Sequence, residues 1–250
     1  MRRDRQGSTP PSGNAVRYYT GTAIIMNIRL NDIVKKIMDG GQADRCDLEW
    51  ISNDLNAGLV DLLTAADMIR RRFNGDAATA CSIISIKTGA CSEDCAYCSQ
   101  SAHHCSGVQP TAYITEDAVG RYAAEMKAEG AFALGVVTSG RGVFKESDAI
   151  QIADSIRAAK KAGIEPHASV GIMTDDRLIR ILIDAGLVVA HHNLESSERF
   201  FPAICSTHTW KERYDTVVAF KRNGLKVCCG ALFGLGETMA DRVDLALTLR

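Results

Sequence analysis

No stretch of this chain is long and apolar enough to cross a membrane. A membrane-spanning helix needs about 20 mostly apolar residues, and the 250-residue sequence has no run approaching that length. The chain also lacks an excess of charge of either sign, because 29 Lys and Arg residues nearly balance 30 Asp and Glu residues. This balance gives no indication of nucleic acid or a membrane surface as a partner, and we expect neither.

A secretory segment is lacking as well, although cysteine is frequent. The nine cysteines are an odd number, which does not suit a disulfide framework. Thiols in a chain without a secretory segment favour a reducing compartment and use in metal or redox chemistry. We therefore expect a cytoplasmic protein. With 46% apolar and 24% charged residues, it has the composition of a globular chain with one sizeable core.

The first 25 residues differ from the rest. They are rich in Arg, Ser, Pro and Gly, and a regular apolar pattern begins only at Met26. We expect residues 1–25 to be a disordered extension, unless translation starts at Met26. An Arg-rich leader also suits an organellar transit peptide, but no amphipathic helix supports that interpretation.

A loop with three cysteines in eight residues is the most informative feature. Cys91, Cys95 and Cys98 directly follow an apolar run that reads as a strand. Three thiolates on a short loop can hold three irons of a [4Fe-4S] cluster, and the fourth iron then stays open to a substrate or cofactor.

The same three cysteines fit a second kind of site. A structural zinc ion requires four ligands, and three residues shortly after the third cysteine offer a fourth: His103, His104 and Cys105. Spacing alone leaves both kinds of site open.

Periodic apolar residues predict helices before the loop and alternating strands and helices around and after it. The expected leading helices are Ile28–Met38, Asp47–Leu55 and Leu59–Phe73. The expected strands are Ser82–Ile86, Phe132–Val137, Pro166–Val170, Val188–His191 and Lys226–Phe233. The expected helices between and after them are Thr115–Glu129, Ser147–Ala162, Asp175–Ala185, Trp210–Asn223 and a last one from Thr238. Glycines 130, 163, 186 and 224 close several of these helices, because glycine readily adopts the left-handed cap conformation.

Five successive strand–helix units predict parallel strands joined by right-handed crossovers. A TIM-type (β/α) barrel and a doubly wound sheet both fit this α/β pattern. In either, active-site residues lie where strands end. We expect residues 26–78 to be a helical lead-in and residues 79–250 to form the strand–helix domain.

Four segments, together with Tyr97 just before the third cysteine, resemble the biotin synthase family of radical S-adenosylmethionine (SAM) enzymes. These segments are Lys87–His103, His192–Leu194, Glu212–Thr216 and Gly234–Thr238. The resemblance implies a TIM-type barrel of the radical SAM kind. That barrel has eight strand–helix units, of which this chain holds about five, so the resemblance also implies a chain truncated at its carboxyl end.

The resemblance also implies the chemistry. A [4Fe-4S] cluster held by the three cysteines would cleave SAM to a 5′-deoxyadenosyl radical. The substrate would be dethiobiotin, which becomes biotin by insertion of sulfur from an auxiliary iron–sulfur cluster, a [2Fe-2S] cluster or a variant, with two SAM molecules consumed. A reduced flavodoxin or ferredoxin would donate electrons, and the full-length protein would be a homodimer.

Four residues match cofactor-binding positions of the family: Tyr97, Asn193, Glu195 and Arg213. Asn193 and Glu195 would meet the sugar of SAM and the substrate, and Arg213 would lie near the SAM carboxylate. These roles suit the side chains, because carboxylates bind hydroxyl groups and guanidinium groups bind carboxylates. Glu195 replaces the family's aspartate and is one methylene longer.

The auxiliary cluster is where the chain departs from the family. Cys228 matches one of its three cysteines, but Ala133 and His167 occupy the other two positions, and its arginine would fall beyond residue 250. Neighbouring strand residues face opposite ways, so we expect Cys228 rather than Cys229 to face the barrel interior, with Cys205 as its partner ligand. This departure leaves two alternatives open, namely a radical SAM enzyme for another small molecule and an inactive barrel fragment.

Overall fold

The computed structural model describes residues 27–53 and 56–250. The extension expected at residues 1–25 lies outside this part of the chain. Five short strands make one sheet: β1 (Cys81–Lys87), β2 (Ala133–Thr138), β3 (Glu165–Ser169), β4 (Val189–His191) and β5 (Lys226–Cys228). Helices alternate with them: α4 (Glu116–Ala128), α5 (Glu146–Lys161), α6 (Asp176–Ala185), α7 (Trp210–Arg222) and α8 (Met239–Leu249).

The strand order distinguishes the two architectures that the sequence left open. The strands are all parallel and lie in the order β1-β2-β3-β4-β5, so each pairs with its neighbour in sequence. In a doubly wound sheet the strands stay parallel, but their order reverses part-way across the sheet, and helices cover both faces. A sequential order with right-handed crossovers places the connecting helices on one face, as in a TIM-type barrel. The described residues therefore form a five-stranded part of such a barrel.

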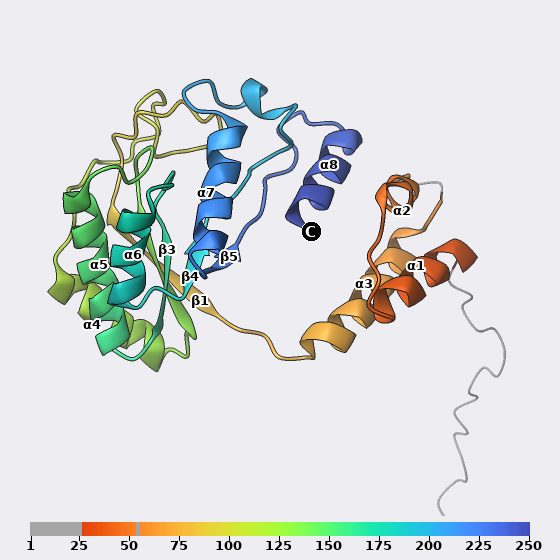
Figure 1. Ribbon diagram of the computed structural model, residues 1–250, viewed down its shortest axis with the longest axis horizontal. Helices are drawn as coiled ribbons and strands as arrows, with labels where there is room; N and C mark the ends of the chain where they lie inside the picture. Colours follow the sequence, from red (N-terminus) through yellow and green to blue (C-terminus); the bar gives the residue numbers. More distant parts are fainter. Residues whose placement is uncertain (1–26, 54–55) are drawn as a thin grey trace, which may run out of the picture.

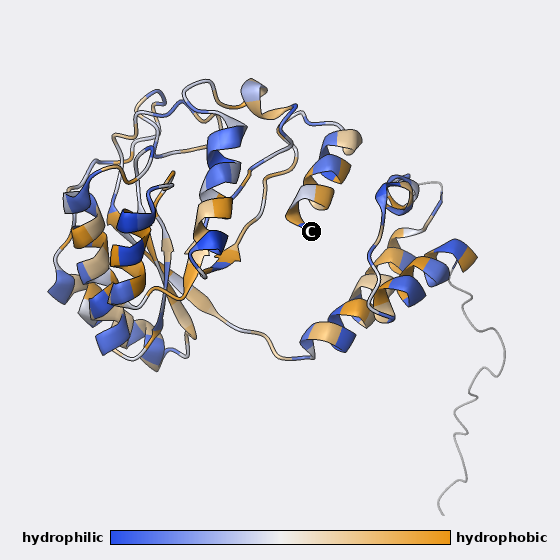
Figure 2. Ribbon diagram, in the orientation of Figure 1, coloured by the Kyte–Doolittle hydropathy of each residue, from blue (hydrophilic) through white to orange (hydrophobic). Residues whose placement is uncertain are grey.

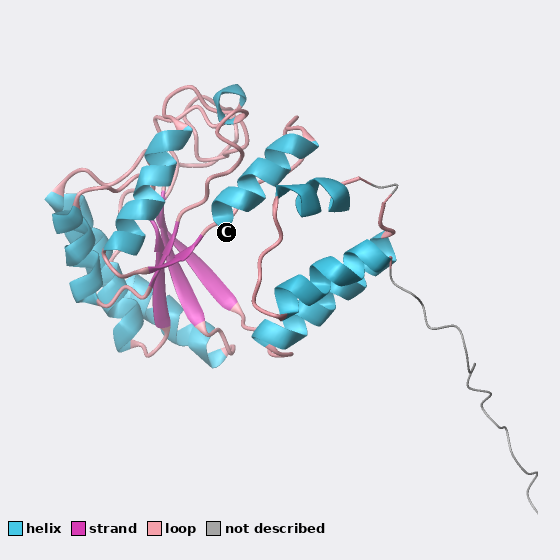
Figure 3. Ribbon diagram, turned by 45° about the vertical axis from the view of Figure 1, so that its right-hand side comes forward, coloured by secondary structure: helices cyan, strands magenta, loops and turns pink. Residues whose placement is uncertain are grey.

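The main core fills the layer between this sheet and helices α4 to α7. Val136, Ala168, Ala190 and Val227 point from successive strands into that layer. Leu182 of α6 is among the helix residues that pack there. The helices lie against this side of the strands in Figures 1 and 3 and carry both apolar and polar bands in Figure 2. Because side chains alternate along a strand, Gly135, His167 and Cys228 face the opposite, inner side.

Three further helices precede the sheet: α1 (Ile28–Met38), α2 (Arg45–Ile51) and α3 (Leu59–Asn74). Leu30, Val34 and Ala65 form a small apolar cluster of their own there. The residues between α3 and β1 are exposed, and α2 approaches α8 at the far side of the sheet (Figure 1). None of the helices in the described residues has the length and apolar character needed to span a membrane.

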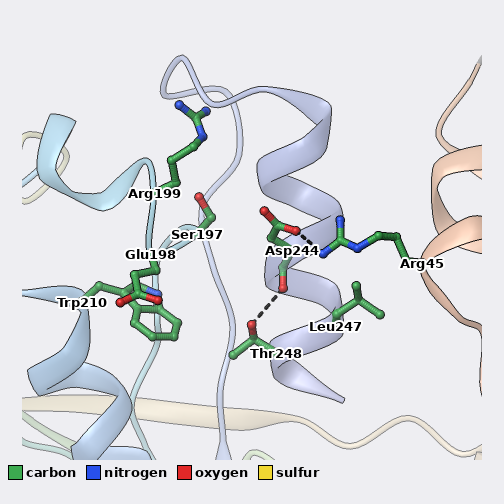
Figure 4. Close-up of a pocket in the computed structure, with 8 residues that line it drawn as sticks. All are labelled: Arg45, Ser197, Glu198, Arg199, Trp210, Asp244, Leu247 and Thr248. Atoms are coloured by element: carbon green, nitrogen blue, oxygen red, sulfur yellow. Dashed lines mark hydrogen bonds and ion pairs between the residues drawn. The ribbon is translucent and has the colours of Figure 1, made fainter.

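A cavity of about 600 Å³ lies between α2, α8 and the segment that follows β4. Figure 4 shows Arg45 reaching across it to Asp244, with Ser197 and Trp210 on the opposite wall. Its lining includes no residue of the three-cysteine loop. The cavity therefore lies apart from the chemistry that the sequence indicates.

Most element boundaries match the expectation within one or two residues, but β5 is shorter than expected. It ends at Cys228 rather than Phe233. Beyond it the chain bonds irregularly to the segment after β4, where Gly230 accepts from the amides of Leu194 and Glu195. Helix α2 begins at Arg45 and ends at Ile51, and residues 54–55 of the expected helix lie outside the described residues. A 3₁₀ turn at Phe201–Ala203 was not expected.

Candidate active site

The three-cysteine loop leaves the carboxyl end of β1 through a tight turn. Gly89 has a φ of +64°, and a Cβ there would lie 2.9 Å from the Cα of Pro110. Only glycine meets both demands without strain. The loop then closes on itself, because the Cys91 amide donates to the Gln100 carbonyl at 3.0 Å and the Cys98 amide to the Cys95 carbonyl at 3.0 Å. Cys91 and Cys95 are buried and Cys98 is half-buried.

The segment after β4 folds back over this loop. Asp94 accepts hydrogen bonds from the amides of Ser206 (2.9 Å) and Thr207 (3.2 Å), and the Ala96 amide donates to the Ile204 carbonyl at 2.9 Å. The hydrogen bonds from Ser206 hold the pKa of Asp94 well below its usual range. Two segments more than one hundred residues apart in the sequence are thus joined into one rim.

Folding back brings Cys205 to the three-cysteine loop. Its sulfur lies 3.7 Å from that of Cys95 and 3.2 Å from Nδ1 of His208. The structure thus places Cys205 beside Cys95, a neighbour that the sequence pattern did not reveal, and the expected pairing of Cys205 with Cys228 in a second cluster stays a prediction. Cys228 ends β5 on the inner side of the sheet.

Arg213 and Glu195 lie beside the loop and bind each other. Arg213 Nη2 is 3.0 Å from Glu195 Oε1, and Arg213 Nε donates to the Asn193 carbonyl at 2.7 Å. Arg213 projects from the first turn of α7, and Asn193 and Glu195 follow β4. Burial raises the pKa of the Glu195 carboxyl, and the Arg213 charge opposes that rise.

Comparisons with known proteins agree with this arrangement. The family model of the radical SAM superfamily matches residues 85–249. The biotin synthase of Trichlorobacter lovleyi is 41% identical over 228 residues, which are 91% of this chain and 68% of that protein. The biotin synthase of Pelobacter propionicus is 42% identical over 190 residues, which are 76% of this chain and 58% of that protein.

This chain belongs to the biotin synthase family of the radical SAM superfamily. It spans 68% of the length of the first of these relatives and 58% of the length of the second. Methylornithine synthase has a similar fold, with a TM-score of 0.75 at 17% identity over 87% of this chain and 64% of its own. HydG, a maturase of the [FeFe]-hydrogenase, has a TM-score of 0.72 at 16% identity over 88% of this chain and 50% of its own.

Membership of this family implies a [4Fe-4S] cluster and SAM, and the loop suits the cluster better than a zinc ion. Sulfurs on one zinc ion, at about 2.3 Å each, lie roughly 3.8 Å apart. Cys91, Cys95 and Cys98 do not form such a close group among the described residues. The proposed fourth zinc ligands lie elsewhere, because the rings of His103 and His104 contact the Ser92 and Cys95 carbonyls and Cys105 is exposed.

The surroundings of Glu195 suit SAM. Its Oε2 atom is buried and has no hydrogen-bond partner among the described residues. A buried carboxylate oxygen without a partner is costly, and a ribose hydroxyl would satisfy it. Glu195 also has a φ of +67°, an uncommon conformation for a residue other than glycine. Such strain is found at functional sites where the surroundings hold the side chain in place.

An auxiliary cluster is typical of biotin synthases, but the three-cysteine pattern for it does not fit this chain. Ala133 offers no ligand atom, and His167 bonds Oε1 of Glu165 at 2.9 Å. Among the described residues, the inner side of the sheet brings no three donor groups within metal-binding distance. Among the three auxiliary-cluster positions of the family, only the one at Cys228 holds a cysteine in this chain.

Two residues of the site were missed at the sequence level. Glu93 and His208 are buried, and Oε2 of Glu93 lies 2.6 Å from Nδ1 of His208. Burial lowers the pKa of His208, which favours the neutral imidazole. The three-residue spacing from Cys205 to His208 was the available signal. It carried no meaning without the knowledge that this segment contacts the cysteine loop.

Proposed function

We propose that this protein catalyses the biotin synthase reaction, in which SAM-dependent radical chemistry inserts sulfur into dethiobiotin. One observation carries the proposal. The three-cysteine loop and the buried Glu195–Arg213 pair share one rim at the carboxyl ends of the strands, which is where barrel enzymes place their active sites.

Each residue of this rim has a task in the proposed reaction. Cys91, Cys95 and Cys98 hold the [4Fe-4S] cluster, which when bound supplies the electron that cleaves SAM. Three thiolates would leave one iron of that cluster without a protein ligand and open to SAM. Tyr97 is half-buried and packs with Phe201 beside the loop, which excludes water.

The sugar and the carboxylate of SAM are assigned to the neighbouring polar residues. Glu195 offers its unpartnered Oε2 to the ribose hydroxyls. Asn193 points its Oδ1 at Nε2 of His191 at 3.2 Å, and its side chain also interacts with the Glu195 carboxylate, so we assign it to the sugar or the substrate beside Glu195. Arg213 holds Glu195 in place and provides the positive charge near the SAM carboxylate.

A second candidate function rests on the auxiliary site. Cys228 remains our proposed ligand of an auxiliary iron–sulfur cluster. The family pattern requires two further cysteines, and this chain has Ala133 and His167 at those positions. A radical SAM enzyme that acts on another small molecule would need no such cluster. In line with the family, we propose a reduced flavodoxin or ferredoxin as electron donor, a cytoplasmic location and a homodimer for the full-length protein.

Anaerobic reconstitution of the 250-residue chain with iron and sulfide tests both functions. We expect about four irons with matching sulfide from a cubane cluster at the loop. We expect about six if Cys228 holds part of a [2Fe-2S] cluster, and about eight if the second cluster is also a cubane. The protein should then cleave SAM to 5′-deoxyadenosine faster when dethiobiotin is present. Zinc without sulfide would contradict the proposal. Cleavage that dethiobiotin does not accelerate would favour the second function.

A further inference from the structure

A fourth thiol lies next to the three expected cluster ligands. The Cys205 side chain is 5% exposed, and its sulfur is 3.7 Å from that of Cys95. Cys95 and Cys205 pack with Phe201 and Ile204 in one apolar cluster. A sulfur this close to one ligand lies at the same corner of a cluster as that ligand. Cys205 is therefore badly placed to bind the distant open iron.

The partners of His208 determine which way the hydrogen of Cys205 points. Arg213 Nη1 lies 3.3 Å from Nε2 of His208, and because a guanidinium only donates, Nε2 must accept. In the neutral imidazole, Nδ1 then carries the hydrogen and donates it to Oε2 of Glu93 at 2.6 Å. This assignment follows from the hydrogen-bond partners.

Cys205 can therefore only accept from the His208 ring. The Cys205 sulfur lies 3.2 Å from Nδ1 of His208, but the hydrogen on Nδ1 already points to Glu93. The thiol hydrogen of Cys205 is left free, and three groups lie within its reach: the Cys95 sulfur at 3.7 Å, Oγ1 of Thr207 at 3.6 Å and the Asp94 carboxylate. Both oxygens of Asp94 already accept hydrogen bonds from Ser206 and Thr207. Once Cys95 is a thiolate ligand it only accepts, and a charged acceptor is the stronger one.

We propose that the Cys205 thiol donates a hydrogen bond to the Cys95 sulfur of the bound cluster and raises the reduction potential of that cluster. Hydrogen bonds to cluster sulfurs stabilise the more negative, reduced state. Glu93, His208 and Arg213 act as positioning residues, because they fix the direction of the Cys205 hydrogen. The inference rests on the proposed function, since it requires the cluster at Cys91, Cys95 and Cys98.

The test compares three variants of the reconstituted 250-residue chain with the wild type. Cys205→Ala removes the donor, Cys205→Ser keeps an O–H donor of similar size, and Cys46→Ala is a control at an exposed thiol of α2. A redox titration followed by electron paramagnetic resonance gives the midpoint potential of each protein. For Cys205→Ala we expect about tenfold less reduced cluster at a fixed potential, which corresponds to about 59 mV for one electron.

A second readout detects the hydrogen itself. Electron–nuclear double resonance of the reduced cluster, recorded in H₂O and D₂O, should show an exchangeable hydrogen in the wild type, in Cys205→Ser and in Cys46→Ala. Cys205→Ala should lose the coupling of the Cys205 hydrogen, whereas other exchangeable hydrogens, such as that of the Tyr97 hydroxyl beside Cys95, should stay visible. A purely structural role for Cys205 would not remove that coupling selectively.

The outcomes are distinct. A common midpoint in all four cluster-bearing proteins, or an unchanged exchangeable signal in Cys205→Ala, would overturn this inference and leave the proposed function standing. A wild-type chain that assembles no cluster would overturn both. Zinc bound by Cys95, Cys205 and His208, whose ligand atoms lie within 4.8 Å of one another, would also overturn it. In that case the apo protein would bind zinc in a way that Cys205→Ser abolishes and Cys46→Ala does not.

Discussion

Arg213 and Glu195 form an ion pair in which Nη2 of Arg213 lies 3.0 Å from Oε1 of Glu195. The two side chains are only 12% and 9% exposed. Glu195 has one carboxylate oxygen engaged in this pair, and the other has no partner among the described residues. The pair therefore fixes the carboxylate and leaves a hydrogen-bond acceptor for a ligand. In the proposed function, stability and cofactor binding would depend on the same two side chains, and mutation can separate the two dependences.

Arg213→Met should destabilise the chain by about 3 kcal/mol, because removing one partner of a buried pair leaves the other charge uncompensated. Denaturant unfolding of the cluster-free protein measures the change. The matched control is Arg222→Met, whose ion pair with Asp176 is more than half exposed and should contribute less than about 1 kcal/mol. The double variant Arg213→Met/Glu195→Gln should recover part of the loss. Equal losses at Arg213 and Arg222 would contradict a buried pair.

Glu195→Gln should weaken SAM binding to the cluster-bearing protein about tenfold or more, because a hydrogen bond to a charged group contributes about 1.5–3 kcal/mol. Equilibrium dialysis with labelled SAM measures the affinity. Glu198→Gln removes an exposed carboxylate three residues further on and should leave the affinity unchanged. An unchanged affinity in Glu195→Gln would remove Glu195 from the cofactor site.

Gly89→Ala should impair cluster assembly, because the new Cβ would lie 2.9 Å from the backbone of Pro110 at a φ of +64°. The matched control is Gly75→Ala, where φ is +69° but no atom lies within 4 Å of the new Cβ. Both variants place a Cβ at a positive φ, which costs on the order of 1–3 kcal/mol, and only Gly89→Ala adds the collision. Iron content after reconstitution should therefore fall in Gly89→Ala alone, and equal iron in the two variants would contradict this account.

Asp241 should make the chain sensitive to acid. Arg199 and the hydroxyl of Ser197 donate to this buried carboxylate, and the Arg199 contact is the main reason that its pKa lies well below the usual range. A lowered folded-state pKa contributes stability above the unfolded value of about 3.9, and that stability is lost as the pH falls. Unfolding measured from pH 6 down to pH 3 should show a shallower decline for Asp241→Asn than for the wild type. Asp215→Asn, at an exposed carboxylate, should decline like the wild type.

Local patterns predicted most of the fold. Apolar periodicity gave the bounds of α1 as observed, and the glycines at 130, 163, 186 and 224 all have positive φ after helices. Strand–helix alternation predicted parallel strands, and the observed order distinguished the barrel from the doubly wound sheet. These features depend on residues that lie within a few positions of one another in the sequence. A sequence pattern therefore reveals them.

The contacts across the site could not be predicted in the same way. Cys205 was expected to be the partner ligand of Cys228, because it lies on the loop after the fourth strand. Its actual place depends on Asp94 capturing the amides of Ser206 and Thr207, a contact across more than one hundred residues. The early end of β5 has a similar cause, since Gly230 bonds the segment after β4. Periodicity carries no information on which loop a carboxylate binds.

The link between α3 and β1 provides a last prediction, which also tests the boundary expected near residue 78. Residues 75–80 are all exposed and lie outside helices and strands. The three leading helices bury apolar residues mainly against one another. Among their contacts with α8 is the ion pair of Arg45 and Asp244, whose side chains are 52% and 43% exposed.

Limited digestion with elastase, which cuts after small residues, should make its first cut within residues 27–250 at Ala77, Ala78 or Ala80. Mass spectrometry locates that cut. Arg45→Ala should accelerate it by no more than about fivefold, because an exposed ion pair contributes at most about 1 kcal/mol. A first cut inside α4 to α7 would contradict a separate helical lead-in. A much faster cleavage of the link in Arg45→Ala would show that α2 and α8 form one cooperative unit. In that case cleavage of the wild type would require α2 to separate from α8 first.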